Sequence, residues 1–243
     1  MNADKIRALF CECFPDTVNE ADIILGFARE HGKIHEISIG ERLASIACTC
    51  PIKDNGFYAE YIFACGTKAE YRGQGLFSRQ LEKITDGTSA LLIPENESLF
   101  AMYEHLGFKT VYCLKLHSES PLPLEEATLE EARLAHKSSF CFPKKSDELF
   151  EATAKAFLSY GNEIKRFGSA VLMMQGEIAT EIFAQSKEEA LSAALACKYS
   201  YLPLDMADML DAKGLKYERI RIASAKNIPD KILDSLYINN LFN

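Results

Sequence analysis

The sequence predicts an α/β protein, of the α+β kind, with two α/β domains. Helical and alternating apolar patterns follow one another along the whole chain, and part of the first half recurs in the second. In addition, the turn Asp54-Asn55-Gly56 joins two alternating segments and predicts an antiparallel hairpin. With 243 residues, 48% of them hydrophobic, the chain can form one large core or two smaller ones.

The elements of the first half follow from apolar spacing and from turn residues. Each predicted helix presents apolar residues at intervals of three and four, and each predicted strand is bounded by glycine, proline or polar turn residues. Gly107 ends the last helix, in the position after its C-cap. In chain order the elements are helices at 3–13 and 18–30, strands at 33–39, 42–50 and 57–67, a helix at 75–84, a strand at 89–93, a helix at 97–107 and a strand at 108–117.

A segment rich in proline and acidic residues, 118–127, separates the two halves, so the predicted domains are 1–118 and 119–243. Residues 201–221 resemble residues 92–112 when a two-residue gap is allowed. Either the second half is a degenerate repeat of the first, or two strand–helix–strand units are alike by chance. The other elements predicted beyond the linker are a helix capped by Thr128 and Glu131, a helix at 146–160, a hairpin at 168–175 and 177–185, and a helix at 187–199.

Composition excludes several classes of protein. No apolar run approaches the roughly 18 residues of a membrane span, and the N-terminal segment lacks the features of a secretory signal, so we expect a cytoplasmic protein. The net charge of −8 is spread over both halves without a basic patch, which argues against nucleic acid as a partner. The eight cysteines and five histidines do not have the spacing of a zinc site, so we expect no metal.

The segment "TKAEYRGQGLFSRQL", residues 67–81, places Arg72, Gly73 and Gly75 just ahead of a helix. A dinucleotide site would need a third glycine at Ser78 and a strand immediately before the glycines. A phosphate site at the helix N-terminus fits better, because the first helical N–H groups and the helix dipole favour an anion. A glycine turn before a core helix is the structural alternative.

The context of this segment resembles the GCN5-related N-acetyltransferase family. A strand precedes the glycines, Pro94 and Asn96 follow a second strand, and "MYEHLGF" continues on a helix. Arg72, Gly75 and Leu76 match the family's pattern Arg/Gln-x-x-Gly-x-Gly/Ala, whereas Phe77 stands where the family usually has Gly or Ala. The motifs cover about residues 60–112. The resemblance implies a mixed, mostly antiparallel central sheet flanked by helices, with a degenerate second copy in the C-terminal domain.

The resemblance also implies roles for individual residues. Backbone groups of Phe63, Ala64 and Cys65 would bind the pantetheine arm of acetyl-CoA, with an N–H near Ala64 stabilising the oxyanion. Tyr103 would be the acid for the departing thiolate and would contact the cofactor. Glu60 would be the base or the amine anchor, or a solvated strand-end carboxylate, and Asn96 would bind the cofactor or cap the next helix. The pyrophosphate would be held by Arg72, Gly73, Gln74, Gly75, Leu76 and Phe77.

We therefore expect an acyltransferase, an N-acetyltransferase that moves an acetyl group from acetyl-CoA to an amine by direct attack. The acceptor would be a small-molecule amine or a protein amine, and no membrane or nucleic acid is expected as a partner. The C-terminal domain would complete a substrate groove or make the contact of a homodimer. A non-catalytic acyl-CoA-binding or regulatory module is the alternative, and a nicotinamide-binding protein is the third hypothesis.

Overall fold

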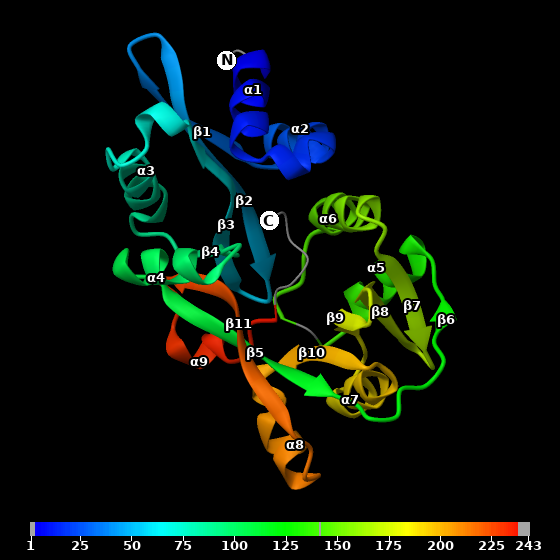
Figure 1. Cartoon of the computed structure of the whole chain (residues 1–243). Helices are drawn as coiled ribbons and strands as arrows, with labels where there is room; N and C mark the ends of the chain where they lie inside the picture. Colours follow the sequence, from blue (N-terminus) through cyan, green and yellow to red (C-terminus); the bar gives the residue numbers. More distant parts are fainter. Residues whose placement is uncertain (1–2, 141, 238–243) are drawn as a thin grey trace. The chain divides into compact units, whose positions relative to one another are not determined.

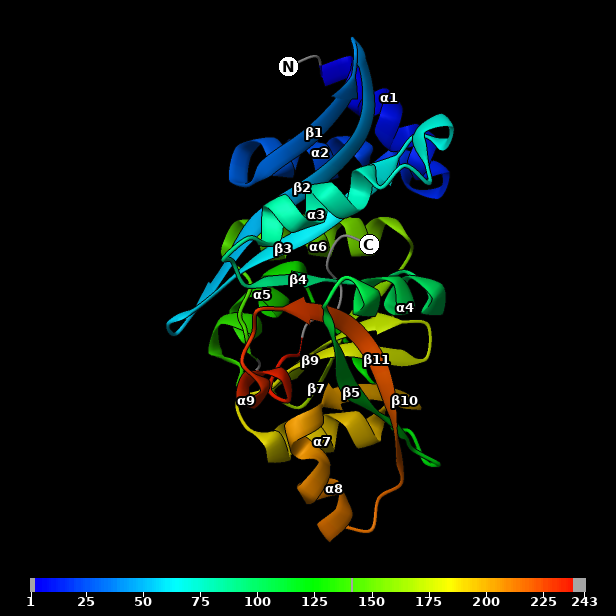
Figure 2. The ribbon, with the colours of Figure 1, turned by 90° about the vertical axis from the view of Figure 1, so that its left-hand side faces the viewer.

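The computed structural model describes residues 3–140 and 142–237, which form two compact units (Figures 1 and 2). Unit 1 contains the described residues up to Lys109 together with Ser224–Ile228, and unit 2 contains Thr110–Ala223 with the chain from Pro229 to Tyr237. The units divide inside strands and not in the proline-rich linker, so the domain boundary at 118/119 stays a prediction. No helix of the described ranges is long and apolar enough to cross a bilayer.

Unit 1 is a sheet with two helices on each face. The sheet order is β1-β2-β3-β4-β11, antiparallel except for the parallel pair β3 and β4. The 3₁₀ segments Pro15–Glu20 and Ala69–Tyr71 connect elements. The helices and strands are α1 (Ala3–Cys13), α2 (Ala21–His31), β1 (Lys33–Ile39), β2 (Arg42–Asp54), β3 (Phe57–Thr67), α3 (Leu76–Thr85), β4 (Ala90–Leu92), α4 (Glu97–His105) and the end of β11 (Tyr217–Lys226).

Alternation along β3 puts different helices on the two faces of this sheet. Phe63 points to α2, where its ring centroid lies 6.3 Å from that of Phe27. The neighbouring Ile62 points to the other face and packs with Leu81 of α3 and Tyr103 of α4 in one buried cluster. Helices α3 and α4, which carry the predicted site residues, therefore cover the same face of β3.

Residues from the far end of the chain complete unit 1. Ser224–Lys226 pair antiparallel with β4, and the next residue, Asn227, has a left-handed backbone with φ of +58°. The Asn227 amide donates to the carbonyl oxygens of Thr85 and Thr88, both at 2.9 Å, and its own carbonyl accepts from Ser89 Oγ at 2.8 Å. Asn227 thereby fixes the turn between α3 and β4.

In unit 2 the strands follow the order β5-β10-β9-β8-β7-β6, antiparallel except for the parallel pair β9 and β10. Leu204–Met206 forms a 3₁₀ turn. The other elements are β5 (Lys109–His117), β6 (Glu125–Glu126), α5 (Leu129–Ser138), α6 (Asp147–Ser159), β7 (Glu163–Phe167), β8 (Ala170–Gln175), β9 (Ile178–Phe183), α7 (Lys187–Ala196), β10 (Tyr199–Pro203), α8 (Ala207–Ala212) and α9 (Asp230–Leu233).

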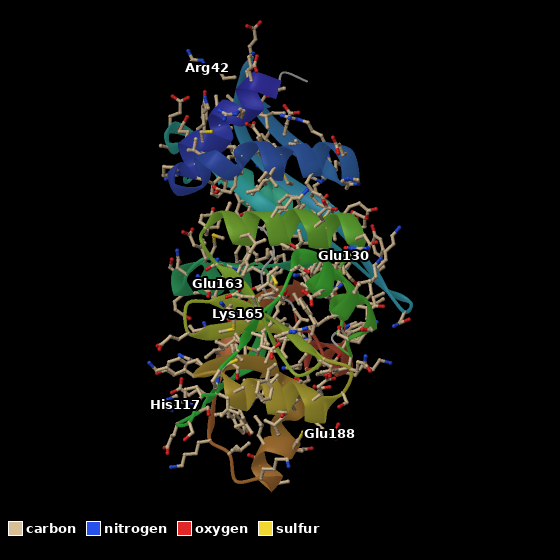
Figure 3. All side chains as sticks on the ribbon, turned by 90° about the vertical axis from the view of Figure 1, so that its right-hand side faces the viewer. Arg42, His117, Glu130, Glu163, Lys165 and Glu188 are labelled. Carbon is tan, nitrogen blue, oxygen red and sulfur yellow. The ribbon has the colours of Figure 1, made fainter. Side chains whose placement is uncertain are left out.

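The edge of the unit 2 sheet is covered by charged pairs. Lys165 of β7 lies close to Glu163 on the same strand, at 3.2 Å, and also contacts Glu126 of the short β6 (Figure 3). Arg166 pairs with Glu125 at 2.6 Å. Exposed edge strands tend to pair with other chains, and charged side chains disfavour such pairing.

The described elements repeat one order, α-α-β-β-β-α-β-α-β, when the short 3₁₀ turns, β6 and α9 are set aside. It runs once from α1 to β5 and again from α5 to β11, which is the order expected of a degenerate repeat. The mixed, mostly antiparallel sheet flanked by helices is confirmed. The strand Glu163–Phe167 was not predicted, and β2 continues through Pro51 to Asp54 beyond the expected end at Cys50.

A buried histidine lies in the core of unit 2. His136 of α5 stacks on Phe150, with ring centroids 4.8 Å apart, and its Nε2 accepts a hydrogen bond from the backbone N–H of Lys145 at 3.2 Å. Burial, and then the charge of Lys145, lower the pKa of His136 to about 3. The imidazole is therefore neutral in the folded protein at neutral pH.

We expect Asn227→Ala to lower the free energy of unfolding by about 2–3 kcal/mol, because it removes two hydrogen bonds and leaves a non-glycine residue in left-handed backbone. Asn227→Gly removes the same hydrogen bonds, but glycine adopts the left-handed backbone without strain. The free energy of unfolding should therefore fall less in this variant. Urea denaturation of both variants measures the difference. Equal losses would show that the backbone conformation costs nothing here.

His136 should make stability depend on pH. The unfolded histidine, with a pKa near 6.5, takes up a proton as the pH falls, whereas the folded one stays neutral down to about pH 3. Stability should therefore fall by up to about 1.4 kcal/mol per pH unit between pH 6.5 and 3. His136→Gln, measured in parallel by denaturant unfolding, should lack this part of the slope; identical slopes would refute the assignment.

Candidate functional site

Strands β3 and β4 are paired over a short length only. Glu60–Ile62 lie opposite Ala90–Leu92, where β4 ends, whereas β3 continues to Thr67. Within residues 3–140 and 142–237, no other strand pairs with this edge of β3 beyond Ile62. The edge therefore presents backbone N–H and C=O groups with which a bound chain rich in amides can pair.

The backbone of β3 is irregular just where the pairing with β4 stops. Ala64 has a φ of +50°, and the register with β2 shifts between Ile46 and Cys48, so β3 contains a bulge at this point. A bulge re-aims the backbone groups next to it. Phe63, Ala64 and Cys65, which were predicted to bind the cofactor through their backbone, thus lie at the gap between the strands.

The side chains of the same residues belong to the core. Phe63 is buried and stacks on Tyr61, with centroids 5.2 Å apart. Cys65 packs on the α3 and α4 side, and burial raises the pKa of its thiol above the usual range. A protonated thiol is a weak nucleophile, so this cysteine is not expected to react.

The glycine loop leads from the end of β3 to the start of α3. Gly73 and Gly75 have φ values of +76° and +70°, and a Cβ at either would meet no atom within 4 Å. Both glycines therefore serve the backbone conformation, and the space beside them is open. Helix α3 starts at Leu76 without a side-chain cap, and its first helical hydrogen bond runs from Arg79 N to Gly75 O at 3.1 Å. The N–H groups ahead of Arg79, including those of Leu76 and Phe77, have no helical acceptor, which is the arrangement that suits an anion; their contact with a pyrophosphate stays a prediction.

Arg72 helps to hold this loop. Its Nε donates to the carbonyl oxygen of Thr67, the last residue of β3, at 3.0 Å. The side chain of Gln74 donates to the Glu70 carbonyl at 3.4 Å. Both hydrogen bonds lie within the loop, so the first role of Arg72 is to close it. Its contact with a pyrophosphate stays a prediction.

A network of buried polar side chains joins the strand end before the loop to the helix after it. Ser45 Oγ of β2 lies 3.0 Å from the Gly66 carbonyl oxygen, 2.9 Å from Thr67 Oγ1 and 3.1 Å from Gln80 Oε1. Gln80 Nε2 in turn donates to the carbonyl oxygen of His35 on β1, at 2.9 Å. Ser45 and Gln80 are not among the predicted site residues. The sequence did contain a signal for Gln80: a glutamine lies among the core positions Phe77, Leu81 and Ile84 of a predicted helix, where a buried polar side chain needs a partner.

Tyr103 lies close to this region on α4. It is 6% exposed, and its ring meets the rings of Phe77 and Phe108 edge-on, with centroids 6.0 and 5.6 Å away. Burial raises the pKa of the phenol, and the neighbouring Cys65 adds to the shift. Tyr103 therefore keeps its proton at neutral pH, as a group that donates a proton must.

Asn96 caps helix α4. Its Oδ1 accepts from the backbone N–H of Leu99 at 3.2 Å and from Ser98 Oγ at 2.6 Å. This cap fixes the start of the helix that carries Tyr103. Of the two roles considered for Asn96, the structure shows the cap, and a contact with the cofactor stays a prediction.

Glu60 lies at some distance along β3 from the gap. Its carboxylate accepts a hydrogen bond from the Tyr58 hydroxyl, which raises the pKa of Tyr58 to about 12. It lines a cavity of about 500 Å³ together with His35 and Lys83. The structure thus brings Cys65, Phe77 and Tyr103 together around the gap, whereas Glu60 belongs to a neighbouring cavity.

No model of a protein family matches the sequence, and no curated protein matches it. Solved structures do match. A GCN5-related N-acetyltransferase from Anabaena variabilis superimposes with a TM-score of 0.60 and 12% identity, over 93% of this chain and 70% of that one. Another, from Kribbella flavida, gives 0.56 and 15%, over 91% and 67%. A protein from Pyrococcus horikoshii, provisionally named an acetyltransferase, gives 0.56 and 9%, over 99% and 92%. The chain has the fold of the GCN5-related N-acetyltransferases.

Unit 2 contains counterparts of the two features of the candidate site, namely a short parallel strand pair and a helix that follows its first strand. In unit 2, however, other side chains of the chain occupy both places. Its parallel pair, β9 and β10, ends at Ala179, and the hydroxyl of Tyr237 bridges the strands beyond by lying 3.2 Å from the Thr180 carbonyl oxygen and 2.6 Å from that of Tyr201. Helix α7 begins at a Ser186 cap. The carboxylate of Glu189 accepts from Gln185 N at 2.7 Å, so the helix N-terminus already has an anion. The candidate site therefore lies in unit 1.

Proposed function

We propose that the protein is an acetyl-CoA-dependent N-acetyltransferase that acts on a small-molecule or protein amine. The observation that supports this most directly is the path in unit 1 from the β3–β4 gap to the uncapped N-terminus of α3. A donor with an amide-rich arm and a pyrophosphate needs these two features in this order.

The residues of the chain suit the chemistry of direct attack. The bound donor would supply the thioester carbonyl that the amine attacks. A backbone N–H at the Ala64 bulge would donate to the carbonyl oxygen as negative charge develops there. Tyr103, whose phenol is protonated, would donate its proton to the departing sulfur. Glu60 would accept the proton of the ammonium through water or anchor the amine, with Tyr58 orienting its carboxylate.

We expect calorimetric titration to show micromolar binding of acetyl-CoA at one site per chain and no binding of NADH. Gly75→Ala should weaken acetyl-CoA binding by about tenfold, because a left-handed alanine costs about 1–2 kcal/mol and shifts the loop. Gly87→Ala is the matched control: Gly87 has a φ of +64° and open surroundings, but lies at the far end of α3. Arg72→Glu should abolish binding.

Absence of acetyl-CoA binding to the unaltered protein would overturn the proposal. Two sites per chain would show that the closed features of unit 2 also bind the donor. Equal weakening by Gly75→Ala and Gly87→Ala would mean that the effect comes from stability and not from the loop.

Tyr103→Phe should separate binding from turnover. The variant keeps the ring and its contacts with Phe77 and Phe108, so its acetyl-CoA affinity should stay within about twofold of the unaltered protein. Turnover with an amine found by screening should fall by about a hundredfold or more, because the proton donor is lost. Release of free thiol measures the rate. Unchanged turnover would exclude Tyr103 as the acid. Binding without turnover on any amine would favour the non-catalytic acyl-CoA-binding module.

A further inference from the structure

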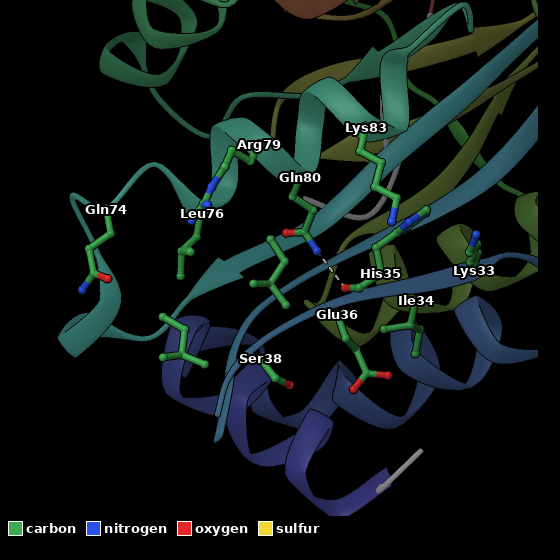
Figure 4. Close-up of a pocket in the computed structure, with 12 residues that line it drawn as sticks. Lys33, Ile34, His35, Glu36, Ser38, Gln74, Leu76, Arg79, Gln80 and Lys83 are labelled. Atoms are coloured by element: carbon green, nitrogen blue, oxygen red, sulfur yellow. Dashed lines mark hydrogen bonds between the residues drawn. The ribbon is translucent and has the colours of Figure 1, made fainter. Parts of the chain in front are cut away.

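A second cavity of unit 1 lies between the edge strand β1 and helix α3, with a volume of about 780 Å³ (Figure 4). Ligand sites for small molecules commonly have volumes of roughly 300–1,000 Å³. One wall is the whole of β1, from Lys33 to Ile39. The other consists of residues on one side of the loop and helix, namely Gln74, Leu76, Arg79, Gln80 and Lys83.

Three cationic side chains line this cavity: Lys33 from β1, and Arg79 and Lys83 from α3. Within the described ranges, none of the three forms an ion pair or a side-chain hydrogen bond. Arg79 and Lys83 are four residues apart and lie on the same side of the helix, where like charges repel. An anion between the three groups would relieve this repulsion.

The nearby carboxylates offset these three positive charges only in part. Glu36 alternates with His35 along β1, and its carboxylate points away from α3 (Figure 4). Glu60 lines the neighbouring cavity together with Lys33 and Lys83, and its carboxylate accepts the hydrogen bond from Tyr58. The walls that face each other across the cavity therefore have a positive excess in a chain whose net charge is −8.

The polar groups of β1 favour a small ligand over an added strand. A peptide that extended the sheet would need the outward carbonyl groups of β1, but the carbonyl oxygen of His35 already accepts from Gln80 Nε2 at 2.9 Å. Gln80 is 4% exposed and is held by Ser45, so it cannot move aside easily. A strand added at the middle of this edge would therefore have to share the His35 carbonyl oxygen with Gln80, which disfavours such pairing.

We propose that this cavity binds a small molecule that carries two or more negative charges, held by Lys33, Arg79 and Lys83. Carboxylate and phosphate groups share the required chemistry, since both accept charge-assisted hydrogen bonds from lysine and arginine. The cavity does not include the β3–β4 gap, although Gln74 and Leu76 of its wall also belong to the loop and helix start predicted to hold the pyrophosphate. Lys33, Arg79 and Lys83 are not among those predicted residues, and competition with coenzyme A separates the two sites. The proposal does not depend on the protein being an acetyltransferase.

Calorimetric titration with citrate and with inorganic pyrophosphate tests the site and distinguishes the two kinds of anion. At least one should bind with a dissociation constant below about 1 mM, and the double variant Arg79→Glu/Lys83→Glu should weaken it at least tenfold. Lys213→Glu/Lys231→Glu is the matched control, because it changes the net charge equally at two exposed residues outside the cavity. The affinity of this control variant for the anion should equal that of the unaltered protein.

Three results would overturn the proposal. They are no binding of either anion up to about 10 mM, equal weakening in the two double variants, or displacement of the bound anion by saturating coenzyme A. The last would assign the cavity to the donor site. Arg79 and Lys83 are exposed on α3, so both variants should fold, and their circular dichroism spectra should match that of the unaltered protein.

Discussion

The candidate site depends on one buried hydroxyl, that of Ser45. A serine hydroxyl has one proton and two lone pairs, so among its three close neighbours it donates to the Gly66 carbonyl or to Gln80 and accepts from Thr67. Ser45 therefore contacts both the end of β3 and helix α3. The glycine loop starts at the first and ends at the second, so one hydroxyl fixes both ends of the loop. The left-handed glycines can then turn the chain without changing the direction of the helix N-terminus.

The comparison of the two units shows how small differences decide where a ligand can bind. Both contain a short parallel strand pair followed by a helix, yet in unit 2 Tyr237 bridges the strands and Glu189 occupies the helix N-terminus. In unit 1 the helix starts at a glycine without a side-chain cap. The fold provides the scaffold in both places, and of these two helix starts only that of α3 is left without a side-chain cap or a carboxylate.

Features fixed by nearby residues were predictable from the sequence. The hairpin at Asn55 and Gly56, both with positive φ, and the capping box of Thr128 and Glu131 are present as expected, because each depends on residues within a few positions. The glycine loop before α3 was located for the same reason. The Ser45–Gln80 network, the pairing of β11 with β4 and the closure of unit 2 by Tyr237 were not predicted, since each joins residues that are far apart in the chain. The role of Glu60 depends on which face of β3 lies over which cavity, and a local pattern does not contain that information.

The completion of unit 1 by Ser224–Ile228 has a consequence for synthesis. The hydroxyl of Ser89 and the carbonyl of Asn227 meet across 138 positions of sequence. On a ribosome, β4 leaves the exit tunnel long before its partner exists, and its free edge stays unpaired until Ser224–Lys226 have been made. During that interval the nascent N-terminal half exposes an unpaired strand edge beside the candidate site, and unpaired edges of this kind are prone to aggregation. The folding of unit 1 is thus completed only when Ser224–Ile228 have been made.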